Sequence, residues 1–214
     1  MNIYELRQKA GREEVDYLFL KSMLHHYDAP RDKIRAYLRK QELIRVKKGL
    51  YVFGKLAARG PYSRETLANL IYGPSCVSLE YALAFYGLIP ERVEVLTSVT
   101  PRRNRFFDTP IGQFEYRYLR AEFYPAGIDL QEIAPERFVL IASPEKALCD
   151  VLLLRGHLAR GTDVDGLAKT LEQDLRIDMR QLARLSSRYF SELARAYQSE
   201  VLRLLTGFSK RRSR

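Results

Sequence analysis

The N-terminal segment carries apolar residues at the spacing of amphipathic helices. Asp16 is a candidate N-cap for a helix over residues 17–25, and a weaker signal indicates an earlier short helix around residues 3–9. The leucines expected to supply the apolar contacts of the capped helix are Leu18, Leu20 and Leu24. Two short helices are therefore expected before residue 30.

A third helix is predicted from Pro30 to about Gln41, because a proline at the first helical position loses no hydrogen bond. Its buried stripe is expected to consist of Ile34, Tyr37 and Leu38. The opposite face centres on Asp32 and Ala36, and basic residues flank it on both sides: Arg35 and Arg39 on one, Lys33 and Lys40 on the other. A small residue among long basic ones allows a helix to lie deep in the major groove of DNA. The alternative is an ordinary solvated helix face.

The pattern then changes to strand alternation. Residues 43–47 and 50–53 flank a Lys48-Gly49 pair, which predicts a tight two-stranded hairpin. Arg45 and Lys47 are expected on one face of this hairpin, with Ile44 and Val46 on the other. A basic helix followed directly by a basic hairpin is the layout of a winged helix-turn-helix, in which the hairpin tip meets phosphates.

Residues 54–62 contain two glycines and a proline and read as a linker. The predicted fold is therefore α+β: a winged helix-turn-helix domain over residues 1–60, then a mixed α/β domain with C-terminal helices over residues 61–214. In the second domain, Ser63 and Ser78 are candidate caps of helices over 64–72 and 79–86. Strands are expected at 93–99, 106–107, 113–119 and 137–141, the last of them fully buried.

The C-terminal third is predicted to be helical. Ser143-Pro144-Glu145 combines three helix-start signals, Thr162 opens the next helix, and Asp178 caps another. A single last helix is expected to carry the remaining apolar positions: Phe190, Leu193, Ala194, Tyr197, Val201 and Leu204.

The positive charge of the chain is concentrated. The net charge is +10, and ten basic residues against two acidic ones lie between Pro30 and Gly60. Two smaller basic clusters are Arg102, Arg103 and Arg105, then Lys210, Arg211, Arg212 and Arg214. A local surplus of this kind indicates a nucleic-acid site ahead of an anionic membrane surface. The turn with Arg102 is open to three interpretations: a contact beside the hairpin, a surface for a protein partner, or a solvated turn.

Sequence signals for catalysis are missing. No phosphate-binding glycine loop or nucleophile elbow occurs, and His25, His26 and His157 lack metal-ligand spacing. Cys76 and Cys149 lie in apolar stretches, which favours buried thiols in a reducing compartment. The sequence shows no signal peptide and no membrane-span pattern. We therefore expect a cytoplasmic protein that is not an enzyme and binds no cofactor, metal or membrane.

Three segments carry a family likeness: PRDKIRAYLRKQELIRVKKGLYVFG, VSLEYALAFYGLIP and SPEKALCDVLLL. Together they resemble AbiEi-type antitoxins of bacterial type IV toxin–antitoxin (abortive infection) systems, from about Pro30 to Leu154. The resemblance implies that the first domain binds the double-stranded DNA of its own promoter as a repressor. It also implies that the second domain counters a cognate nucleotidyltransferase toxin without a stable complex being required.

Two rival interpretations remain open at this point. One is a winged-helix transcription factor whose second domain senses a ligand or dimerises, and the other is an enzyme that acts on nucleic acid. The residues expected to contact DNA are Arg31, Asp32, Lys33, Arg35, Ala36, Arg39, Lys40, Arg45, Lys47, Lys48 and Gly49, with Arg102, Arg103 and Arg105 as a second basic patch.

Overall fold

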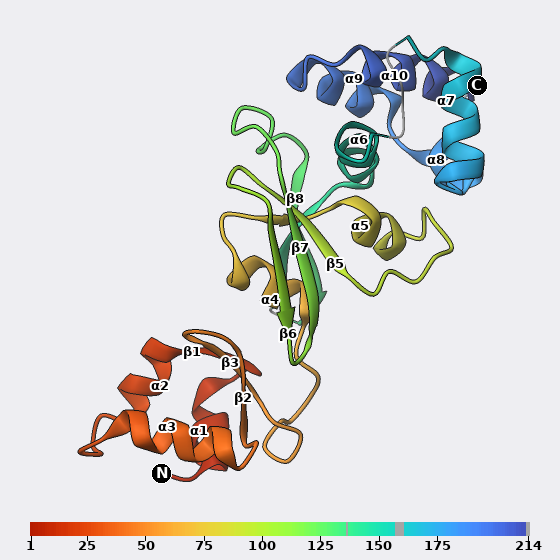
Figure 1. Cartoon of the computed structure of the whole chain (residues 1–214). Helices are drawn as coiled ribbons and strands as arrows, with labels where there is room; N and C mark the ends of the chain where they lie inside the picture. Colours follow the sequence, from red (N-terminus) through yellow and green to blue (C-terminus); the bar gives the residue numbers. More distant parts are fainter. Residues whose placement is uncertain (136, 157–160, 213–214) are drawn as a thin grey trace.

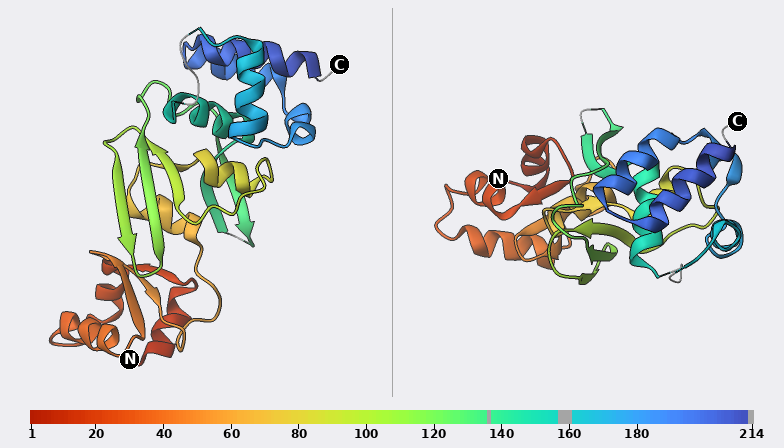
Figure 2. Two further views of the ribbon diagram at one scale, coloured as in Figure 1. Left: turned by 45° about the vertical axis from the view of Figure 1, so that its right-hand side comes forward. Right: turned by 90° about the horizontal axis from the view of Figure 1, so that it is seen from above.

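The computed structural model describes residues 1–135, 137–156 and 161–212 and shows an α+β protein with two sheets. His157 and Arg214 lie outside these residues. A small unit (residues 1–60) lies below one end of the larger sheet, and a large unit (residues 61–212) carries the helices that end the chain (Figure 1). Further views show the small unit at one end of the molecule and the C-terminal helices at the other (Figure 2).

The small unit packs three helices on a three-stranded antiparallel sheet of order β1-β3-β2. Its elements are α1 (Ile3–Ala10), β1 (Glu14–Asp16), α2 (Tyr17–Met23), α3 (Pro30–Arg39), β2 (Leu43–Lys47) and β3 (Leu50–Phe53). Its core is built mainly from side chains of these elements: Ile3, Leu6, Val15, Leu20, Leu24, Ile34, Tyr37, Leu43, Tyr51 and Phe53.

Local capping accounts for most of these boundaries. The Asp16 carboxylate accepts the Phe19 backbone N–H at 2.7 Å and so starts α2 as predicted. Gly49 has φ +86°, which a tight β2–β3 turn favours and a residue with a Cβ rarely adopts. Leu18, expected in the core, is 73% exposed instead. Leu18 and buried Leu20 are two positions apart on α2, so their side chains are separated by about 200° around the helix axis and point in nearly opposite directions.

The large unit is built on a mixed six-stranded sheet of order β6-β7-β5-β4-β9-β8. Its strands are β4 (Cys76–Val77), β5 (Leu96–Thr100), β6 (Arg105–Thr109), β7 (Gly112–Tyr118), β8 (Ile128–Ala134) and β9 (Arg137–Ala142). The β5–β7 and β4–β9 pairs are parallel, and the others are antiparallel.

The helices of this unit are α4 (Arg64–Ile71), α5 (Leu79–Phe85), α6 (Pro144–Leu154), α7 (Val164–Lys169) with a π-helical continuation (Thr170–Asp174), α8 (Met179–Arg184), α9 (Ser187–Ala196) and α10 (Glu200–Arg212). The Tyr116 hydroxyl donates to Ala68 O of α4, whereas the carboxylate of its neighbour Glu115 pairs with Arg155 at the end of α6. Since successive side chains of a strand point to opposite faces, α4 and α6 cover opposite faces of the sheet. None of the helices in the described ranges has the length and apolarity needed to cross a membrane.

Several expectations for the large unit need correction. Strand β5 begins at Leu96 and not at Val93, and β1, β4 and β8 had no sequence-based prediction. Strand β9 is not fully buried, because Phe138 is 51% exposed and Leu140 is 39% exposed. Only part of this strand is covered, and the buried side chains are those of Val139, Ile141 and Ala142.

The predicted helix starts of the large unit are confirmed in part. Ser63, Ser143 and Asp178 cap α4, α6 and α8 as predicted, each accepting a backbone N–H of the first turn. Asp163, not Thr162, caps α7. Ser78 precedes α5, but its hydroxyl donates to the Asp150 carboxylate at 2.6 Å instead of capping the helix.

The single helix expected at the C-terminus is in fact two. Helix α9 ends at Ala196 and α10 starts at Glu200, and Gln198 between them has φ +51°. A non-glycine residue in the left-handed region cannot continue a right-handed helix, so the chain changes direction there. The helical spacing of apolar residues continues through this break, so the sequence pattern did not predict it.

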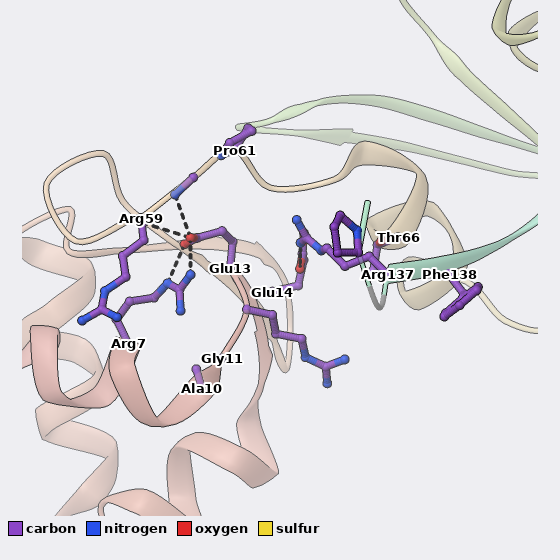
Figure 3. A pocket seen from close by; sticks show the side chains of 13 residues that line it. Arg7, Ala10, Gly11, Glu13, Glu14, Arg59, Pro61, Thr66, Arg137 and Phe138 are labelled. Carbon is purple, nitrogen blue, oxygen red and sulfur yellow. Dashed lines mark hydrogen bonds and ion pairs between the residues drawn. The ribbon is translucent and has the colours of Figure 1, made fainter. Parts of the chain in front are cut away.

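Two adjacent glutamates, Glu13 and Glu14, at the start of β1 hold the junction between the units (Figure 3). Glu13, just before β1, pairs with Arg7 and accepts the backbone N–H groups of Arg59 and Gly60, both at 3.0 Å. Glu14 accepts the Ser63 N–H at 2.6 Å and pairs with Arg137 of β9. The connecting segment is therefore fixed at several points, although its composition is that of a linker.

Candidate nucleic-acid interface

A groove runs between helix α3 and the β2–β3 hairpin on the surface of the small unit. Its volume is approximately 690 Å³. The residues that line it are Tyr17, Arg31, Ile34, Arg35, Leu38, Arg45, Lys48, Gly49 and Tyr51. We call this the α3–hairpin groove. It brings together four of the predicted cations, two from the helix and two from the hairpin.

The local sequence explains why these cations meet. Arg31 and Arg35 are four residues apart and therefore lie one above the other on the side of α3 that faces the hairpin. Arg45 is an exposed position of β2 opposite Tyr51, and Lys48 is at the hairpin tip. The Tyr17 N–H donates to Gly49 O at 2.9 Å, which ties this tip to the start of α2.

The charges in the groove are largely uncompensated. Arg31 donates to the Tyr17 hydroxyl at 3.1 Å, a neutral partner that leaves the positive charge in place. Arg35 forms an ion pair with Asp32 at 3.1 Å, but both side chains are highly exposed and such pairs contribute little energy. Within the described ranges, no carboxylate lies at ion-pair distance from Arg45 or Lys48. The groove is thus a concentrated positive surface.

Other predicted residues of α3 lie beside the groove or away from it. Arg39 and Asp32 line a neighbouring hollow with Arg35 and Leu38. Lys33 lies over the rings of Tyr27 and Tyr37, at 5.3 and 5.2 Å. These two tyrosines are not in the groove.

Two further predicted residues, Ala36 of α3 and Lys40 directly after it, differ from the prediction of a symmetric basic face. Lys40 lines a separate hollow with Pro110 of the β6–β7 turn. Ala36 is partly buried and lines neither the groove nor the hollow beside it. The positive surface of α3 is therefore displaced toward its Arg31–Arg35 side.

Lys47 departs most clearly from its predicted place. It was expected on the same face as Arg45, but a register shift between these residues places it differently. Its ammonium donates to Ile71 O at the end of α4, and partial burial lowers the pKa of Lys47. No local sequence signal reports this contact, because its partner is a backbone carbonyl in the other unit.

The second basic patch spans the connection between β5 and β6 and the first residue of β6, Arg105. The Arg102 guanidinium lies 5.9 Å from the centre of the Tyr72 ring, directly after α4, while Arg103 and Arg105 are exposed. Helix α4 thus ends between this patch and the hairpin, since Ile71 contacts Lys47 and Tyr72 contacts Arg102. Lys210 and Arg211 do not join either patch, because α10 lies at the far end of the molecule (Figure 1).

A buried polar cluster in the large unit has no counterpart in the predicted site. Lys146 and Asp150 of α6 form an ion pair at 3.3 Å with both side chains 0% exposed. The Tyr197 hydroxyl donates to Asp150 at 2.8 Å, and the Ser78 hydroxyl donates at 2.6 Å. The spacing of a lysine and an aspartate four residues apart on an apolar helix is the sequence signal that could have revealed it. Its burial assigns it to holding α5, α6 and α9 together.

The described residues offer little for other chemistry. They contain no group of three or more His, Cys, Asp or Glu side chains placed to hold a metal ion. Cys76 and Cys149 are buried free thiols, as expected, and burial raises the pKa of each above its usual range. Both therefore remain protonated and unreactive at neutral pH.

Comparison of the chain with protein-family models and with curated protein sequences finds no match.

Proposed function

We propose that this protein binds double-stranded DNA through its small unit, as a member of the winged helix-turn-helix class. The observation that carries the proposal is the α3–hairpin groove, where Arg31, Arg35, Arg45 and Lys48 meet with little neutralisation. The order of helices and strands in the small unit, with an exposed basic helix followed by a hairpin, supports the same class.

In the proposed complex, α3 enters the major groove, which is wide enough to admit a helix. Arg35, which lines both the α3–hairpin groove and the neighbouring hollow, and Arg39, which lines that hollow, are the proposed contacts to base edges or phosphates. Arg45 and Lys48 contact the backbone beside the groove, and the Gly49 position at the tip allows close approach to a phosphate. Base contacts supply the sequence preference, and phosphate contacts supply most of the affinity.

We further propose that the target is the protein's own promoter, and that the protein acts in the cytoplasm as the antitoxin of a type IV toxin–antitoxin system. The support is the resemblance of three segments, from about Pro30 to Leu154, to AbiEi-type antitoxins. The proposed task of the large unit is to counter a nucleotidyltransferase toxin. Arg102, Arg103 and Arg105 are its candidate residues for contact with that toxin, or with DNA beyond the hairpin.

A second candidate function rests on a cavity at the junction of the units (Figure 3). It has a volume of approximately 640 Å³ and is lined by residues that include Arg12, Arg59 and Arg137. A ligand bound there would contact both units, as in a transcription factor that senses a small molecule. In this alternative the large unit has no antitoxin role.

The first test measures binding of the purified full chain to a duplex from upstream of its own gene and to a scrambled duplex of equal length. Tighter binding to the upstream duplex supports promoter recognition. Replacement of Arg35 by alanine is expected to weaken this binding by about 1–3 kcal/mol if Arg35 makes a bidentate base contact. Equal affinity for both duplexes would refute sequence-specific binding.

The second test separates the two candidate functions. The full chain is co-expressed with a nucleotidyltransferase-like protein encoded beside it, and growth is compared with expression of that neighbour alone. Restored growth supports the antitoxin role, and absence of protection favours the ligand-sensing factor. A variant with Arg102, Arg103 and Arg105 changed to serine reports whether the second basic patch takes part.

A further inference from the structure

The β2–β3 hairpin has two sides with different surroundings. Arg45 and Lys48 line the α3–hairpin groove on one side. On the other side, Val46, Leu50 and Val52 are buried in the core cluster of the large unit. The hairpin is therefore shared: one side belongs to the candidate DNA surface, and the other side is packed against the rest of the protein.

Lys47 adds a polar anchor to this packed side. Its ammonium donates to Ile71 O, the carbonyl of the last residue of α4. The last carbonyls of a helix lack partners within the helix and carry a partial negative charge, so an ammonium is a favourable partner. Lys47 thus lies in the sequence between Arg45 and Lys48, which face the groove, while its own ammonium binds the protein.

Helix α4 is a firm reference point for this anchor. The Tyr116 hydroxyl donates to Ala68 O of α4 at 2.6 Å from one part of the sheet. From another part, the Asn69 side chain bonds both backbone groups of Leu140, accepting its N–H at 2.8 Å and donating to its carbonyl at 3.1 Å. Because α4 is fixed to strands β7 and β9, the Ile71 carbonyl that Lys47 binds is fixed as well.

We propose that Lys47 is a positioning residue of the DNA-binding surface: by tying the hairpin to the end of α4, it holds Arg45 and Lys48 in place relative to α3. This inference rests on the proposed function of the α3–hairpin groove. It makes the large unit part of the DNA-binding apparatus, since a partner or ligand that displaces α4 also displaces the hairpin. Lys47 itself contacts no phosphate.

The test is a double-mutant comparison in the full chain. Lys47→Met keeps the apolar stem and removes the ammonium, whereas Lys47→Arg keeps a cation that can still donate to Ile71 O. DNA affinity is measured at low salt in the wild-type protein and in an Arg45→Ala/Lys48→Ala background. We expect Lys47→Met to weaken DNA binding about tenfold in the otherwise wild-type protein and to have almost no effect in the Arg45→Ala/Lys48→Ala background. Lys47→Arg is expected to restore the binding that Lys47→Met loses. An equal loss in both backgrounds, or no loss in either, would overturn the inference.

A measurement on the free protein tests whether Lys47 anchors the hairpin independently of DNA binding. Amide hydrogen exchange of the free protein is compared for wild type, Lys47→Met and Lys48→Met. Exchange at residues 43–50 is expected to accelerate in Lys47→Met alone, while exchange within α3 stays unchanged. Unchanged exchange in Lys47→Met would refute the anchor. If the wild-type protein binds no DNA, the proposed function fails, and this measurement still decides whether Lys47 fixes the hairpin.

Discussion

Arg137 and Glu14 lie 123 residues apart in the chain and form an ion pair with 2.7 Å between Nη2 and Oε2. The Glu14 side chain is fully buried, and its other oxygen accepts the Ser63 N–H at the start of the large unit. A single carboxylate of the small sheet thus holds both the entry to α4 and the first residue of β9.

Replacement of Glu14 by alanine is expected to destabilise the protein by about 2–4 kcal/mol, because it leaves a partly buried guanidinium and a buried N–H without their acceptor. Chemical denaturation followed by circular dichroism measures this loss. The exposed pair Arg92–Glu94 provides the control. Glu94→Ala is expected to cost less than about 0.5 kcal/mol. Equal effects of the two variants would show that Glu14 does not secure the junction.

The buried pair Lys146–Asp150 gives a second stability prediction. Lys146→Met leaves the Asp150 carboxylate buried without its cation, and we expect a loss of about 3–5 kcal/mol in the free energy of unfolding. The double variant Lys146→Met/Asp150→Leu carries no buried charge and is expected to lose less than the single variant. A double variant that is less stable than Lys146→Met would contradict this account.

Tyr37 gives a prediction at alkaline pH. Burial raises the pKa of Tyr37 from its ordinary value of 10.0 to about 12, and its hydroxyl donates to Met1 O at 2.9 Å. Between these two values the unfolded chain has released a proton that the folded protein keeps, so the stability contributed by Tyr37 is present below about pH 10 and lost toward pH 12. Urea unfolding across this range is expected to show a smaller fall in stability for Tyr37→Phe than for wild type. An identical fall in both proteins would refute the assignment.

The packing of the hairpin predicts the behaviour of a fragment. A chain of residues 63–214 lacks the side chains of Val46, Leu50 and Val52, which are buried in the core cluster of the large unit. Since burial of one such side chain contributes about 1.5–3 kcal/mol, the fragment is expected to be less stable than the full chain by at least about 2 kcal/mol. Thermal and urea unfolding of both proteins measure the difference. A fragment as stable as the full chain would mean that the large unit does not depend on the hairpin.

The elements that were predictable from sequence have local causes. The cap at Asp16, the proline at Pro30, the turn at Gly49 and the helix start at Ser143 depend on residues within a few positions of each other, and all are present in the structure. The meeting of Arg35 with Arg45 in one groove also follows from neighbouring elements joined by a short connection.

The features that escaped prediction depend on distant partners. Strand β4 has only two residues, too few for an alternating pattern, and exists because β5 and β9 pair with it on either side. The direction of Lys47 is set by Ile71 of α4, and that of Ser78 by Asp150 of α6. Sequence periodicity specifies which face of an element is apolar, but not which element covers that face.

The α3–hairpin groove is proposed to contact DNA phosphates, and the salt dependence of DNA affinity tests this contact most directly. The logarithm of the affinity is expected to fall linearly with the logarithm of salt concentration, with a slope of roughly 0.9 per neutralised phosphate. Arg45→Ala/Lys48→Ala should therefore reduce the slope by about 1.8. The control Lys9→Ala/Arg12→Ala removes the same charge from exposed positions outside the groove and should leave the slope unchanged. A slope that is equal in wild type and in the Arg45/Lys48 variant, or equally reduced in both variants, would contradict the account.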